Sequence, residues 1–173
     1  MVYKKRHFHD FLTELNESNT KVYINGNEIK YNKFFIPKVE GIYDIKIVIN
    51  IKMKNCSFMF SDCGNITEID LSSFDASEAT DISHMFYECY LLRSINFKNF
   101  NTNNVVNMSY MFVKCTRLEE LDISSFNINK INLENSMKDL FLDCKSLTTV
   151  VVNKDSSDKI RKKLKPYVSL ILI

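Results

Sequence analysis

The chain has 173 residues, 45% hydrophobic and 25% charged, which is an ordinary globular composition and enough chain to bury one continuous core. The formal net charge is +2, and no basic run is interleaved with aromatic residues, so the sequence argues against nucleic-acid binding. No apolar run approaches the ~20 residues that a membrane-spanning helix needs. The N-terminal residues also lack the apolar segment of a secretory signal.

Residues 1–50 are predicted to form a β-rich N-terminal cap. Asn25-Gly26 lies between alternating apolar residues, which is the strongest short signal for a β-hairpin. Residues 34–37 and the alternating apolar residues of 43–51 predict two further extended segments that lead into the rest of the chain. Four apolar residues before the hairpin follow helical spacing: Phe8, Phe11, Leu12 and Leu15.

Residues 51–153 contain about four copies of an internal repeat. The copies that begin at Met59, Met85 and Met111 follow one another at intervals of 26 residues without gaps. The fourth copy begins at Leu140, 29 residues after the third, so three residues have entered within 127–139. Four columns of the repeat stay apolar: Cys63, Cys89, Cys115 and Cys144; Ile66, Leu92, Leu118 and Leu147; Ile69, Ile95, Leu121 and Val150; Leu71, Phe97, Ile123 and Val152.

These columns have the L-x-x-L-x-L spacing of leucine-rich repeats. Their alternation, as in Leu121-Asp122-Ile123, predicts a short strand whose polar residue points outward. One unit cannot bury its apolar edge alone, so the units must stack. We therefore predict an α/β-type repeat solenoid, a short leucine-rich-repeat stack with one parallel β-sheet face. A second internal column should hold Phe74, Phe100 and Phe126, and the Met-Phe pairs should open short helical or irregular segments on the opposite face.

Residues 154–173, together with the last repeat strand, are predicted to form a strand-helix-strand cap. Ser156 or Ser157 can cap a helix that runs through Lys165 and is ended by Pro166. Residues 167–173 then read as a final strand. A bare apolar edge there would invite aggregation, so the helix or a partner should cover it.

The repeat pattern M-F-x-x-C-x-x-L-x-x-L-D-L-S-x-F resembles the BspA-like leucine-rich-repeat family over roughly residues 53–153. Those repeats recur in surface proteins of bacteria, mycoplasmas and protists. The resemblance implies a solenoid with a role in adhesion or protein binding, and it supplies no catalytic residues. It also implies the cell surface, whereas the absence of an export signal or membrane segment indicates the cytoplasm, so the compartment stays open.

The cysteines are expected to be structural. Cys63, Cys89, Cys115 and Cys144 share one column, so we predict an internal ladder of buried, reduced thiols rather than a zinc site or disulfides. Cys56 should lie in the column of Ile82 and Met108. His7-Phe8-His9 reads as a solvated segment, and His84 as a coil-surface residue at the position of Tyr110.

No phosphate-binding loop, G-x-S-x-G or H-E-x-x-H motif occurs, so we predict a protein that is not an enzyme and that needs no metal or cofactor. The expected partner is a protein, with a glycan as the alternative. The alternatives are a structural spacer or a fragment of a larger surface protein, and, more distantly, an enzyme.

The predicted binding face is polar and mildly acidic. Its footprint of about 350 Å² falls well below the ~800 Å² that each partner contributes to a standard interface, so binding should be weak or multivalent. The face consists of the outward strand positions: Glu68, Asp70, Ser72, Ser94, Asn96, Lys98, Glu120, Asp122, Ser124, Thr149, Val151 and Asn153.

Overall fold

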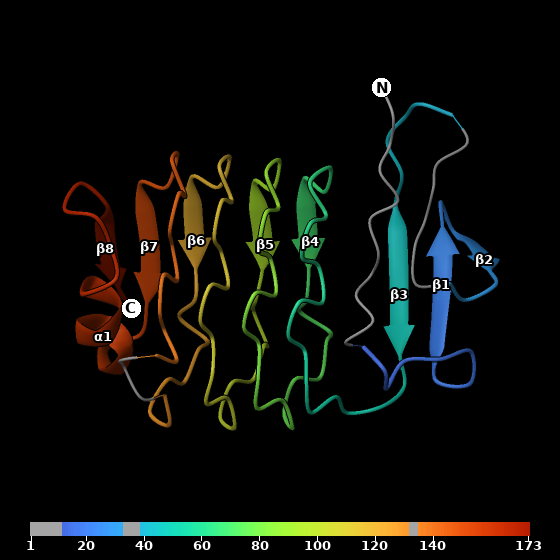
Figure 1. The fold of residues 1–173 in the computed structure, drawn as a ribbon, viewed down its shortest axis with the longest axis horizontal. Coiled ribbons are helices and arrows are strands. Elements are labelled where there is room, and N and C mark those ends of the chain that lie inside the picture. The colour runs from blue at the N-terminus through green and yellow to red at the C-terminus, as the bar shows by residue number, and fades with distance from the viewer. Residues whose placement is uncertain (1–11, 33–38, 132–134) are drawn as a thin grey trace.

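A computed structural model describes residues 12–32, 39–131 and 135–173. Its strands lie side by side along the long axis of the molecule, with β1, β2 and β3 at one end and α1 at the other (Figure 1). In chain order the elements are β1 (Thr20–Ile24), β2 (Asn27–Ile29), β3 (Ile45–Ile49), β4 (Glu68–Asp70), β5 (Ser94–Asn96), β6 (Glu120–Asp122), β7 (Thr149–Val152), the 3-10 helix η1 (Lys154–Ser156), α1 (Ser157–Arg161) and β8 (Ser169–Leu172).

The N-terminal end is an antiparallel sheet in the order β2-β1-β3. The hairpin predicted at Asn25-Gly26 is confirmed, and both turn residues have positive φ (49° and 81°), as a type I′ turn requires. The extended segment predicted within 43–51 is confirmed as β3, which pairs with β1. The predicted N-terminal helix is not seen at Leu12 and Leu15, which form a turn. The remainder of that helix, and residues 34–37, lie outside the described residues.

Beyond this sheet the chain forms successive coils whose strands pair in parallel. Glu68 pairs with Ser94 in the β4–β5 ladder, and Glu120 pairs with Thr149 in the β6–β7 ladder, so the pairing follows the repeat alignment. The strands form two sheets, β4-β5 and β6-β7-β8, where one continuous sheet was predicted. The split falls beside the coil with the largest side chain in that column. The residue after β5 is the buried Phe97, whereas the neighbouring coils have Leu71 and Ile123 at this position. The leucine-rich-repeat class itself stays a prediction.

The opposite side of the stack holds neighbouring coils together without regular helix or strand. Between the second and third coils, the N–H groups of His84, Phe86 and Glu88 donate to the carbonyls of Ser109, Met111 and Val113 at 2.8–3.0 Å. These bonds join the same two coils whose strands, β5 and β6, do not form a ladder with each other. Of the two predictions for this face, helical or irregular segments, the irregular one is confirmed.

The same segments carry a repeated left-handed backbone that the sequence did not indicate. Non-glycine residues with φ between 48° and 60° recur at two positions of each coil, although this region is unfavourable for L-residues. The hydrogen bonds between coils offset that cost, because the left-handed residues orient the neighbouring N–H and C=O groups toward the adjacent coils. These residues are Phe58, His84, Tyr110 and Asp139 at the first position and Asp62, Glu88, Lys114 and Asp143 at the second.

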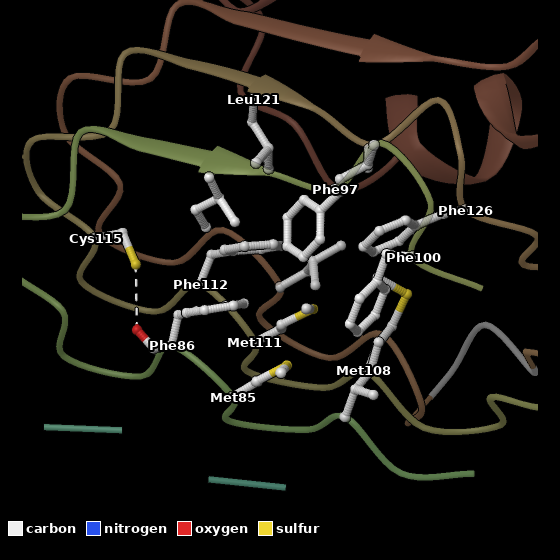
Figure 2. Close-up of a cluster of buried hydrophobic side chains, with 14 of the residues drawn as sticks. Met85, Phe86, Phe97, Phe100, Met108, Met111, Phe112, Cys115, Leu121 and Phe126 are labelled. Carbon is white, nitrogen blue, oxygen red and sulfur yellow. Dashed lines mark hydrogen bonds between the residues drawn. The ribbon is translucent and has the colours of Figure 1, made fainter. Parts of the chain in front are cut away.

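Aromatic columns fill the interior. Phe112 stacks on Phe86 with ring centroids 5.6 Å apart and on Phe141 at 5.8 Å. The predicted second column is confirmed, since Phe100 stacks on Phe74 at 6.0 Å and on Phe126 at 5.7 Å. Phe97 lies between the two columns, with its ring edge-on to those of Phe86, Phe100, Phe112 and Phe126 (Figure 2).

The insertion in the last coil lies between Ile131 and Met137. Ile131 keeps the register of Val105, 26 residues earlier, whereas Met137 lies 29 residues after Met108. Both Ile131 and Met137 are buried, so the coil regains its column after the insertion. The repeat register therefore shifts by three residues between these two buried side chains.

The C-terminal helix is shorter than predicted. Helix α1 ends at Arg161 rather than Lys165, and the chain continues in tighter turns in which the N–H of Lys163 donates to the carbonyl of Ile160. Pro166 disfavours a helical conformation at Lys165, and the chain must reverse to start β8. Ser156 is the N-cap residue of α1, as predicted, but its side chain makes no capping hydrogen bond; at the start of η1 the Asn153 side chain accepts the N–H of Ser156. The final strand is confirmed as β8, parallel to β7.

Candidate binding face

The first outward row of the sheet presents exposed side chains. Glu68, Ser94 and Glu120 are exposed at equivalent positions of β4, β5 and β6, as predicted. No hydrogen bond or ion pair of the Glu68 and Glu120 carboxylates is found within the described residues. These two carboxylates are therefore available to an external partner.

The second outward row has a structural role in addition to its place on the predicted face. The side-chain oxygens of Asp70, Asn96 and Asp122 accept the backbone N–H groups two residues further on, at 2.8, 3.1 and 2.9 Å. The bond from the Ser72 N–H holds the pKa of the Asp70 carboxyl below its ordinary value. These side chains shape the turn after each strand. The Asp or Asn that recurs at this position of three consecutive coils was the signal that could have revealed this role.

Asn153 belongs to the interior framework rather than to a free surface. Its amide nitrogen donates to the carbonyls of Ser124 and Phe126, at 2.9 and 2.6 Å. Thr149 and Val151 are half-buried because β8 lies beside β7. Of the predicted face, Lys98 remains exposed, while Ser72 and Ser124 are half-buried.

The cysteine column forms a hydrogen-bonded ladder. The thiols of Cys89, Cys115 and Cys144 donate to the carbonyls of Phe60, Phe86 and Phe112 at 3.1, 3.2 and 2.9 Å, one coil earlier in each case. Figure 2 shows the bond from Cys115. Burial raises the pKa of the Cys144 thiol to about 12. The thiols of this ladder are therefore protonated and unreactive at neutral pH.

One prediction about the thiols was too broad. Cys89, Cys115 and Cys144 are buried as expected, but Cys63 is only half-buried at the first position of the ladder. Cys56 is fully buried, and the parallel bridges from Asn55 to Asp81 and from Asp81 to Asn107 place it in the column of Ile82 and Met108, which confirms that alignment.

The thiol hydrogen bond determines which substitution at Cys89 costs more stability. A serine hydroxyl would meet the Phe60 carbonyl as an acceptor, whereas alanine removes the donor, so Cys89→Ser should be more stable than Cys89→Ala by about 1 kcal/mol. Cys56 is the matched control. It is buried, and its thiol has no hydrogen-bond acceptor in the described part of the chain, so there the serine variant should be the less stable one. Urea unfolding of the four variants measures both differences. The same order at both sites would contradict the role of the hydrogen bond.

His84 lies on the coil surface between aromatic rings. Its ring stacks on Phe58 at 4.3 Å and on Tyr110 at 4.8 Å, and burial in this stack lowers its pKa. Because the rings cover one another, they present edges rather than open faces. His7 and His9 lie outside the described residues.

The described residues form shallow surface grooves. A groove of about 470 Å³ next to the insertion is lined by Val106, Asn107, Ser109, Lys130, Asn135 and Ser136. This lining includes no histidine or carboxylate that could act as a base. Within the residues that the structure covers, no three potential metal ligands come together, and no helix is long and apolar enough to cross a bilayer.

These features define a repeat protein whose stacked 26-residue coils carry exposed polar side chains on one sheet face. Residues 54–164 match the model of the family described as "Mycoplasma protein of unknown function, DUF285", and the chain belongs to that family. No curated protein and no solved structure gives a significant match.

Proposed function

We propose that the chain is a leucine-rich-repeat solenoid that acts as a protein-binding module, without catalytic activity, through the outward face of β4–β7. The observation that supports this proposal is the contrast between the two sides of each strand. Inward residues repeat as Ile69, Ile95, Leu121 and Val150, whereas the exposed row changes from coil to coil. A constant interior that supports a varied surface suits recognition.

Charge and chemistry favour a protein partner over a glycan. The outward positions contain no aromatic residue, so a sugar ring would find no flat apolar surface on which to stack. Glu68 and Glu120 carry free carboxylates and are exposed. Basic side chains of a partner would complement them, and this attraction should weaken as salt rises.

The size of the face indicates weak individual contacts. Its footprint of about 350 Å² is less than half of a standard interface per partner. Display of several copies together would raise the avidity without any new contact. The module should therefore be tested as an oligomer.

The test is an array of defined basic, neutral and acidic peptides together with glycans, probed with a biotinylated chain assembled on a tetrameric carrier. Glu68→Lys/Glu120→Lys should lose at least tenfold in binding to the basic peptides. Asp70 and Asp122 are left unchanged because they stabilise turns. Glu78→Lys, an exposed acidic residue outside the strands, is the matched control and should bind as the parent chain does.

The same experiment separates the module from a structural spacer. A spacer would bind none of the probes above background, which would contradict the proposal. Equal binding by the double variant and the control would show that the sheet face is not the site. Retained far-ultraviolet circular dichroism would confirm that the variants fold.

A further inference from the structure

Strand β8 has one edge that pairs with β7 and one that is open. The N–H groups of Ser169 and Ile173 donate to β7-side carbonyls, at 2.7 Å to Thr148 and 3.1 Å to Val152. In a parallel strand, alternate residues bond to the same neighbour, so the N–H and C=O groups of Leu170 and Leu172 face away from β7. No other strand pairs with β8 in the described residues.

Apolar side chains accompany this open edge. Ile171, Leu172 and Ile173 are 47%, 53% and 71% exposed. A groove of about 220 Å³ lies between α1 and β8, with Leu170 and Leu172 on the strand side and Ser157, Asp158 and Arg161 on the helix side. The groove could receive one inward-facing side chain of an added strand.

The surroundings of the edge are basic. Residues 153–173 contain six lysine and arginine residues and two aspartates. Lys162 and Lys165 are exposed, and the Arg161 guanidinium donates to the Val168 carbonyl at 3.1 Å, which holds a positive charge beside the start of β8. An acidic partner would complement this charge, whereas a second copy of the same edge would bring like charges together.

A lipid surface would satisfy the charge but not the backbone. Unpaired N–H and C=O groups find no partners in hydrocarbon, whereas a strand pairs with all of them. The chain itself shows that an acidic strand can lie beside an apolar one, because β6, with Glu120 and Asp122, pairs in parallel with the valine-rich β7.

We propose that the open edge of β8 binds an extended acidic peptide segment of a partner protein by strand addition. The peptide would pair with the backbone of Leu170 and Leu172, place apolar side chains over Leu172 and the groove, and direct carboxylates toward Arg161 and Lys162. This site is separate from the sheet face proposed above, so either can fail without the other.

A fluorescein-labelled peptide with the sequence of residues 116–126, TRLEELDISSF, is a suitable probe. Fluorescence anisotropy should show saturable binding to the full chain, weakened severalfold by Lys162→Glu and by added salt. Lys54→Glu, an exposed lysine that precedes β4 and whose carbonyl accepts the N–H of Thr80, is the charge control and should bind normally. A probe whose three acidic residues are replaced by lysine should bind at least tenfold more weakly.

The backbone is tested by Leu172→Pro, which removes an N–H on the open side without removing a bond to β7, with Leu172→Ala as its control. The proline variant should bind at least tenfold more weakly than the alanine variant. If the proline variant does not fold, hydrogen exchange in the parent chain decides, because the Leu170 and Leu172 amides should become protected when the probe is added.

Absence of binding, or binding without that protection, would overturn the proposal. So would β8-dependent self-association in sedimentation experiments, or binding to anionic vesicles in place of the peptide.

Discussion

Phe112→Ala is expected to lower the free energy of unfolding by about 3–5 kcal/mol, the range measured for a large aromatic side chain removed from a core. Phe112 is fully buried. Its ring stacks on Phe86 and meets Phe97 edge-on (Figure 2). It also stacks on Phe141, so it joins its own coil to the coils before and after it. The stacked neighbours are held by backbone bonds between coils and cannot collapse fully into the space left behind. Urea unfolding followed by circular dichroism measures the loss.

Phe74→Ala is the control for this prediction. Phe74 belongs to a comparable column but is only half-buried, and its one recorded ring contact within the described chain is with Phe100 at 6.0 Å. Its removal should cost less than half as much as that of Phe112. Equal losses from the two substitutions would show that the stack does not transmit packing between coils as described.

The second large effect concerns alkaline pH. Burial raises the pKa of Cys56, Cys63 and Cys144 from the ordinary 9.0 to about 12. The pKa values of Cys89 and Cys115 are also raised by burial. Above pH 9 the unfolded thiols therefore lose protons that the folded thiols keep. The free energy of unfolding, which has its full value below pH 9, should fall as pH rises toward 12, by up to about 1.4 kcal/mol per thiol per pH unit.

Five thiols together should remove on the order of 5 kcal/mol by pH 10, comparable with the whole stability of a typical domain. Urea midpoints measured at pH 8, 9 and 10 under reducing conditions provide the test. Cys89→Ala/Cys115→Ala removes two of the five titrating groups, so its decline with pH should be about two-fifths shallower. A decline as steep as that of the parent chain would assign the alkaline effect to other groups.

The repeat register was predictable because it depends on local pattern. An interval of 26 residues and an apolar column can be read along the chain, and the structure pairs Ile69 with Ile95 and Leu121 with Val150 accordingly. The Asn25-Gly26 hairpin was equally local, since two residues with positive φ define that turn. The candidate face followed from the same alternation, and Glu68 and Glu120 lie on it as expected.

Other features depended on contacts between coils. The split between β5 and β6 and the left-handed residues such as Glu88 arise from how one coil meets the next, which no single repeat encodes. The same holds for the Cys89 thiol, whose acceptor is the Phe60 carbonyl of the preceding coil. Asp70 and Asp122 look free in the alternating pattern, yet their carboxylates bond to the turns that follow. The alternation along the chain is enough to identify the inward-facing residues, because burial of apolar surface requires that period. The polar atoms that already have partners are visible only in the folded chain, because those partners come from the stacking of whole coils and from the turns between them.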